Sequence, residues 1–152
     1  MSLISIYAPN PQIENRLLEL LSVMSEEWAE PICATGFSDF SGFLESGRHN
    51  PRRILILAQE GTTSVELVAT AVEECPSSPV VWLSDLDFAL YSYHLEVAYF
   101  GLLPVTKEMM HMVLRSCGRK KQYGFVSTQS ASQIPAHRTL WKRLADFLKI
   151  NS

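Results

Sequence analysis

The residues best placed to do chemistry are polar side chains that directly follow apolar runs of the chain. Asn10, the pair Gln59-Glu60 and the pair Ser84-Asp85 each stand where such a run stops. Carboxylate oxygens suit a hard cation such as Mg²⁺, but neutral amides make a poor site for it. Acidic side chains are seldom buried without a partner, so we interpret Glu60 and Asp85 as solvated loop charges.

The other residue types that carry chemistry show no catalytic or metal-binding spacing. The glycines form neither G-x-G-x-x-G nor a P-loop, and no serine lies in a G-x-S-x-G context. An odd number of widely spaced cysteines without C-x-x-C argues against a disulfide framework and a structural zinc site. We therefore expect no enzymatic activity, no metal and no cofactor. The histidines and cysteines in question are His49, His94, His111, His137, Cys33, Cys75 and Cys117.

Composition favours one globular domain with an appendage. The chain has 152 residues, of which 47% are hydrophobic and 19% charged, so a sizeable core can form. No apolar run approaches the roughly 18 residues that a membrane helix needs, and no signal peptide is evident. We expect a cytoplasmic protein without a membrane partner.

The net charge of −3 hides a strong asymmetry along the chain. Residues 1–114 hold 15 acidic and 5 basic side chains, whereas residues 115–152 hold 1 acidic and 8 basic side chains. An acidic body with a basic tail predicts that the tail contacts the body, a partner, or an anion such as nucleic acid.

The hydrophobic pattern predicts five strands that alternate with five helices. This order calls for right-handed crossovers and a doubly wound parallel sheet, with the flavodoxin-like strand order 2-1-3-4-5. The runs at 53–58 and 80–83 are unbroken, as central strands covered on both faces require. The expected strands are residues 3–7, 31–35, 53–58, 80–83 and 100–103, and the expected helices are 13–24, 38–44, 64–74, 88–93 and 106–117.

In the stretch from Pro79 to Thr106, Ser84 closes a predicted strand and is followed by Leu86-Asp87-Phe88-Ala89-Leu90. This stretch resembles the end of a response-regulator receiver domain, most closely the receivers of LytTR-type regulators, in which D-E-Y-A-L begins one residue later after the strand. The likeness is to a pattern over roughly 115 residues rather than to a rigid motif. Further positions in register are Tyr93, Leu95, Val97 and Phe100-Gly101-Leu102-Leu103-Pro104.

This resemblance implies a phosphorylation site that the chain has largely lost. A working receiver has an acidic pair after the first strand, a phosphoacceptor Asp after the third, and a Lys after the fifth. Alignment by strands places Ala8 and Pro9, Ala58, and Leu103 at those positions. Only Ser84 fits its role, that of the hydroxyl after the fourth strand, and Phe100 fits the aromatic residue that changes rotamer in the family. The resemblance therefore implies a degenerate pseudo-receiver.

The composition of the chain becomes basic and polar after Cys117. We therefore predict a receiver-like domain over residues 1–118, followed by a basic linker and an amphipathic helix over residues 119–152. Gly118 is a natural helix stop, and the basic cluster Arg119-Lys120-Lys121 follows. Residues 123–127 are a candidate short strand, residues 127–136 read as a linker, and residues 138–150 form an amphipathic helix. Its apolar stripe must be buried on this domain, on a second copy, or on another protein, and docking on its own domain is favoured. The stripe consists of Leu140, Trp141, Leu144, Phe147 and Leu148.

These observations favour a phosphorylation-independent signalling module that acts by contact with a protein partner or a second copy. By resemblance, the interface draws on residues 88–93, on Tyr91 and Tyr99, and on residues 107–115. One alternative is part of a transcription regulator that contacts DNA through the basic tail. Another is a small-molecule sensor that uses the emptied crevice around Ala8, Ala58 and Leu103.

Overall fold

The computed structural model describes residues 2–28 and 31–122, and in them five strands alternate with five helices. All strand pairs are parallel, and the sheet order is β2-β1-β3-β4-β5. This is the doubly wound order that the alternation predicted, and that prediction is confirmed. The strands are β1 (Ser2–Tyr7), β2 (Ile32–Phe37), β3 (Ile54–Ala58), β4 (Val80–Ser84) and β5 (Tyr99–Leu102). The helices are α1 (Pro11–Glu27), α2 (Phe40–His49), α3 (Thr63–Glu74), α4 (Ala89–Leu95) and α5 (Lys107–Gln122).

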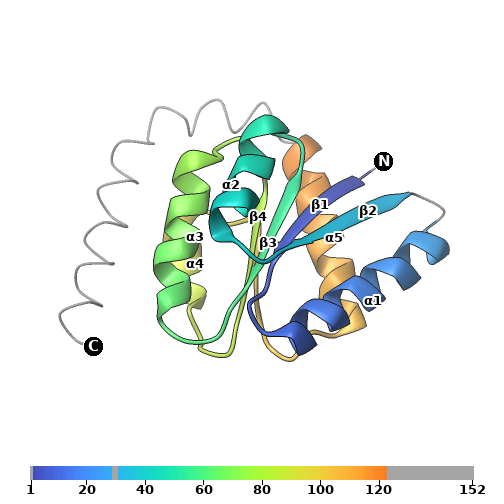
Figure 1. The fold of residues 1–152 in the computed structure, drawn as a ribbon, viewed down its shortest axis with the longest axis horizontal. Helices are drawn as coiled ribbons and strands as arrows, with labels where there is room; N and C mark the ends of the chain where they lie inside the picture. The colour runs from blue at the N-terminus through green and yellow to red at the C-terminus, as the bar shows by residue number, and fades with distance from the viewer. Residues whose placement is uncertain (1, 29–30, 123–152) are drawn as a thin grey trace.

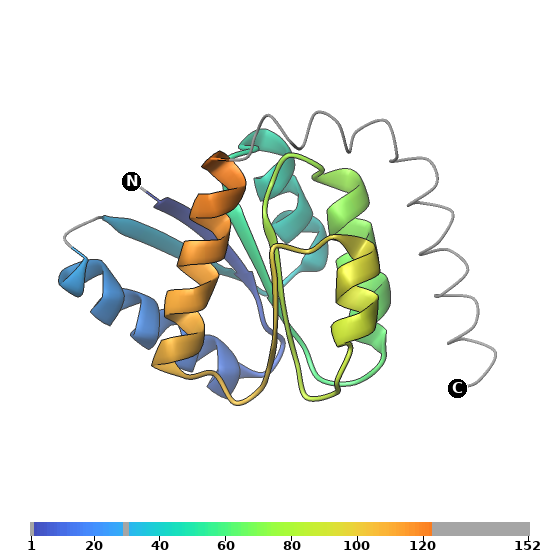
Figure 2. The same cartoon turned by 180° about the vertical axis from the view of Figure 1, so that it is seen from behind.

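Two hydrophobic clusters cover the two faces of the sheet. One joins α1 and α5 to one face, and the other joins α2, α3 and α4 to the opposite face (Figures 1 and 2). Every residue of β3 and β4 is buried, as their unbroken apolar sequences predicted. Both central strands therefore separate two cores, with Ile56 on the α1–α5 side and Leu57 on the α2–α4 side.

Local signals explain where several helices begin. The Asn10 side chain caps α1 by accepting a hydrogen bond from Gln12 N at 3.0 Å, and Pro11 follows at the first helical position. The Thr106 hydroxyl accepts from Met109 N at 3.2 Å at the start of α5.

Four helices, α1, α2, α4 and α5, extend beyond their predicted ends, and α2 and α5 do so furthest. Helix α2 runs to His49 rather than ending at residue 44. Gly47 is required for packing, because a Cβ there would stand 2.8 Å from Cys75 Sγ and 2.9 Å from Leu55 Cδ1. Helix α5 continues through Gly118 to Gln122 and takes in the basic cluster, so Gly118 does not end it.

The remaining predictions about the tail lie outside the described residues. They concern the strand at 123–127, the linker at 127–136, and the helix at 138–150 with its stripe of Leu140, Trp141, Leu144, Phe147 and Leu148. Within residues 2–28 and 31–122, no helix is long and apolar enough to cross a membrane.

Candidate functional site

The positions that the resemblance aligns with a receiver's phosphorylation site lie together at the carboxyl edge of the sheet. Ala8 follows β1, Ala58 ends β3 and Ser84 ends β4, and all three are buried. Leu103 follows β5, and its backbone N–H donates to the Ser84 carbonyl at 2.8 Å. Pro9 is exposed beside them. The fold thus brings the five positions together, although they come from separate parts of the chain.

Their side chains cannot perform aspartyl phosphoryl chemistry. The methyl group of Ala58 is fully buried and offers no oxygen to a phosphoryl group. Ala8 and Pro9 supply no carboxylate for Mg²⁺, and Leu103 supplies no cation for developing negative charge. In the part of the chain that the structure describes, no three His, Cys, Asp or Glu side chains are grouped to hold a metal ion.

The polar groups at this edge are hydrogen-bonded to the surrounding loops. Asp85 Oδ1 accepts from Gly61 N at 2.8 Å and lies 3.4 Å from Ser84 Oγ. Ser84 Oγ also accepts from Leu86 N at 3.2 Å. Asp85 therefore ties the β4–α4 loop to the β3–α3 loop, where Gly61 adopts a φ of 86° that favours glycine. This link has no local sequence signal, because its partners are 24 residues apart.

The carboxylate of Glu60 faces the start of α1. Asn10 Nδ2 donates to Glu60 Oε1 at 3.3 Å, and both Glu60 and Asp85 are exposed. Their interpretation as solvated loop charges therefore agrees with the structure. Gln59 donates from Nε2 to Thr63 Oγ1 at 3.0 Å, while its Oε1 is buried without a partner among the described residues.

A cavity of about 480 Å³ opens beside these loops. One wall is apolar and comes from α1 and from the segment after β5, and the other walls carry amide, guanidinium and carboxylate groups. Such a pocket can bind a small molecule, but its side chains do not form a catalytic set. It is lined by Asn10, Gln12, Ile13, Arg16, Glu60, Asp85, Leu103, Pro104 and Val105.

Phe100, the predicted switch aromatic, belongs to a buried aromatic cluster. Its ring meets that of Trp82 edge-on, with centroids 5.4 Å apart, and Trp82 stacks on Phe88 at 5.0 Å. Trp82 Nε1 also donates to Ser64 Oγ at 3.2 Å. The sequence analysis does not predict this cluster. The feature that could have indicated it is the strand register, which pairs Trp82 with Phe100.

Exposed apolar side chains gather around α4 and β5. Leu90 and Tyr93 on α4 are 68% and 79% exposed. Tyr91 and Tyr99, the tyrosines expected at an interface, are both partly buried, and burial raises the pKa of Tyr99. We call the set of exposed side chains the α4–β5 surface. It consists of Leu86, Leu90, Tyr93 and Leu102, four of the seven large exposed hydrophobic residues that the described ranges contain.

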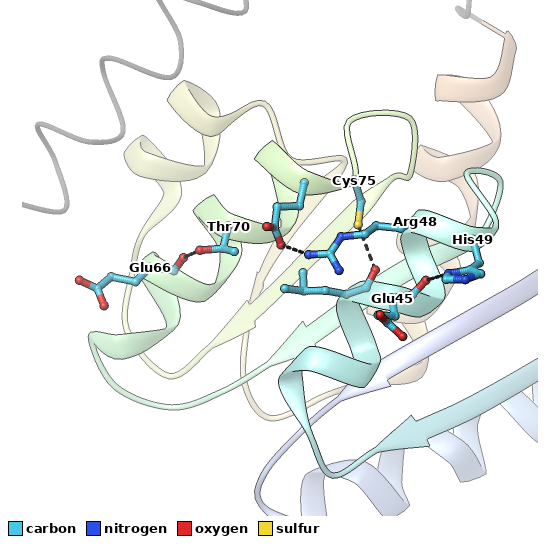
Figure 3. A network of polar contacts seen from close by, with 8 residues as sticks. Glu45, Arg48, His49, Glu66, Thr70 and Cys75 are labelled. Atoms are coloured by element: carbon cyan, nitrogen blue, oxygen red, sulfur yellow. Dashed lines mark hydrogen bonds and ion pairs between the residues drawn. The ribbon is translucent and has the colours of Figure 1, made fainter.

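A second polar cluster, between α2 and α3, is structural (Figure 3). Arg48 and Glu74 form an ion pair of 2.5 Å between the two helices. Beside it, Cys75 Sγ donates to the Leu44 carbonyl at 3.4 Å. Burial raises the pKa of the Cys75 thiol, and the nearby Arg48 guanidinium opposes the rise only in part. A neutral, buried thiol of this kind is unreactive.

The fold that these elements make is the flavodoxin-like fold of response-regulator receiver domains. A receiver domain protein from Clostridium thermocellum superposes with a TM-score of 0.64 at 16% identity, over 81% of this chain and 99% of that one. The signal receiver domain of a modulated diguanylate cyclase from Desulfovibrio desulfuricans G20 gives a TM-score of 0.63 at 14% identity, over 82% and 98%.

A third neighbour is a CheY-like receiver domain protein from Methanospirillum hungatei JF-1, with a TM-score of 0.63 at 9% identity over 81% and 98%. Identities this low establish a shared fold and nothing further. No family model matches the sequence. A search of curated proteins finds no match either.

Proposed function

We propose that this chain is a pseudo-receiver, a signalling module that acts by protein–protein contact without aspartyl phosphorylation. The observation that carries the proposal is Ala58. It ends β3 inside a receiver fold, fully buried, where the resemblance implies a phosphoacceptor. A fold that keeps this architecture without its acidic site retains surfaces for contact but no phosphoryl chemistry.

The α4–β5 surface is the contact region that we propose for a partner. Tyr93 and Leu90 are the most exposed large apolar side chains among the described residues, and they lie one helical turn apart on α4. Exposed aromatic and aliphatic side chains grouped on one surface are typical of protein interfaces. Figure 2 shows α4 on the outside of the sheet, and the exposed fractions of Leu90 and Tyr93 leave both side chains accessible to a partner.

Affinity capture from an extract of the source cells tests this proposal. We expect a protein, or a second copy of the chain, to be retained by the wild type and lost with the double variant Leu90→Asp/Tyr93→Asp. Ser22→Asp on the exposed side of α1 is the matched control and should retain it. Equal capture by all three proteins would place the contact elsewhere. A chain that stays monomeric and captures nothing would contradict the proposal.

The cavity at the carboxyl edge supports a second candidate function, a sensor for a small uncharged or zwitterionic molecule. Arg16 faces the same space as Glu60 and Asp85, so the pocket presents both signs of charge beside an apolar wall. A thermal-shift screen of metabolites would test this. A ligand whose stabilisation is lost in Arg16→Ala would support the sensor, and a screen without any hit would leave it without support.

A further inference from the structure

The predicted helix at 138–150 needs a surface to cover its apolar stripe. Leu140, Trp141, Leu144 and Phe147 share one side of the helix at helical spacing. The segment after α5 is far too short to build a core of its own, since chains below about 40 residues seldom fold alone. The stripe must therefore pack against something outside the segment.

The α4–β5 surface is the best matched apolar surface of the described domain. Among the described residues, three other large hydrophobic side chains are exposed. They are Val23 on α1, Trp28 at the end of α1 and Met112 on α5. One of these, Trp28, already packs against the His111 ring with centroids 5.3 Å apart. The Tyr93 ring meets that of His94 edge-on at 5.8 Å, yet Tyr93 and Leu90 are each more exposed than any of those three.

Charge also matches the two partners. Residues 54–106, which form β3 to β5, contain seven acidic side chains and no lysine or arginine. Asp85, Asp87 and Glu96 are exposed beside the α4–β5 surface. Residues 138–150 carry four basic side chains and one acidic. An apolar surface with an acidic rim suits an apolar stripe flanked by lysine and arginine.

The chain between the two is long enough. Fifteen residues, 123–137, separate the end of α5 from the start of the predicted helix. Fully extended, they span up to about 50 Å. That exceeds the diameter of a small domain, about 30 Å. The segment can therefore reach α4 from the end of α5 without leaving its own molecule.

We infer that residues 138–150 dock on the α4–β5 surface of the same chain and cover it. This inference rests on the proposed function, because it makes the contact surface an intramolecular site that a partner must share or open.

Amide hydrogen exchange of the full chain tests the docking. Leu144→Asp places a charge at the centre of the stripe, and Ala145→Asp places the same charge one residue away, toward the polar side. We expect Leu144→Asp to accelerate exchange about tenfold in both α4 and residues 138–150, as loss of a local packing contact should. Ala145→Asp should leave both unchanged, and Leu90→Asp should accelerate exchange in residues 138–150.

Three results would overturn the inference. One is an unprotected 138–150 segment in the wild type, and another is α4 exchange that Leu144→Asp does not alter. The third is protection that appears only as the protein concentration rises and the mass doubles, since the stripe would then cover a second copy. If the docking fails while Leu90→Asp/Tyr93→Asp still abolishes partner capture, the proposed function stands without the tail.

Discussion

Phe100 of β5 meets Trp82 of β4 edge-on across the register pair that joins the two strands. Trp82 is fully buried and stacks on Phe88 at the start of α4. The residue that the resemblance aligns with the switch aromatic is thus packed into an aromatic cluster. That cluster links β5 to the helix that carries the proposed contact surface.

We predict that Phe100→Ala lowers the free energy of unfolding by about 2 kcal/mol. The cost is smaller than that of truncating a fully buried Phe, because Phe100 is only partly buried. It includes the loss of the edge-to-face packing on Trp82. Urea denaturation would measure the change. Tyr93→Ala, at a side chain that is 79% exposed, is the control and should change stability by less than about 0.5 kcal/mol. Equal effects of the two variants would contradict the packing described.

Ala58→Asp should destabilise the domain by about 3 kcal/mol at neutral pH. The new carboxylate would be buried at the end of β3 with no cation at Leu103 to pair it. Ala58→Asn, with nearly the same shape but no charge, is the matched control and should cost less. The gap between the two variants should narrow on acidification, because protonation removes the buried charge. If the two variants were equally stable, or became so on addition of Mg²⁺, the site would still accommodate a carboxylate, and the prediction would be wrong.

Asp85→Ala should cost about 1 kcal/mol, because it removes the acceptor of the Gly61 N–H and the link between two loops. Glu19→Ala, at an exposed acid on α1, controls for loss of one negative charge and should be near neutral. Denaturant titration of both variants would separate the two effects. An Asp85→Ala domain as stable as Glu19→Ala would mean that the loops hold their positions without this bond.

Stability should fall at alkaline pH. Burial raises the pKa of Cys75 above its ordinary value of 9.0, and that of Tyr99 above 10.0. The folded state therefore keeps protons that the unfolded chain has lost. Stability is fully present below pH 9 and decreases as pH rises through the folded pKa values. Cys75→Ala and Tyr99→Phe should each reduce the slope of unfolding free energy between pH 9 and 11, and slopes equal to the wild type would refute this assignment.

Thiol labelling should separate the three cysteines. Cys33 is exposed on the edge strand β2, whereas Cys75 and Cys117 are buried. A maleimide should therefore modify Cys33 rapidly and the other two only when the domain opens. Mass spectrometry of labelled peptides would read this out, with Cys33→Ser as the control that should abolish the fast phase. A fast phase that survives in Cys33→Ser would show that one of the buried thiols is accessible.

The sequence predicted the central strands well, because β3 and β4 must be apolar at every position when helices cover both faces. Features that depend on distant residues were missed. The packing role of Gly47, for example, becomes visible only in the structure, where Leu55 and Cys75 lie against it. The Asp85–Gly61 link has no local signature either.

The interface residues illustrate the same limit. Helix α4 has only seven residues, too few for its apolar pattern to show which side packs on β5. Tyr91, a possible interface residue, is partly buried and packs edge-on against Phe88, whereas Leu90 and Tyr93 are exposed. The proposed loss of the phosphorylation site, in contrast, follows from the sequence alone and stays a prediction, because the strand ends decide which residues are aligned with those positions.

The most direct test of the central claim is the intact mass of the full chain after incubation with a small acyl phosphate donor and Mg²⁺. We predict no phosphoryl adduct, because Ala58 offers no carboxylate to the phosphoryl group and the side chains of Ala8 and Pro9 offer no oxygen ligand to the metal. A functional receiver treated in parallel controls for the donor. A hydroxylamine-sensitive adduct on this chain would show that another carboxylate, such as Glu60 or Asp85, serves as phosphoacceptor, and the module would then be phosphorylation-dependent.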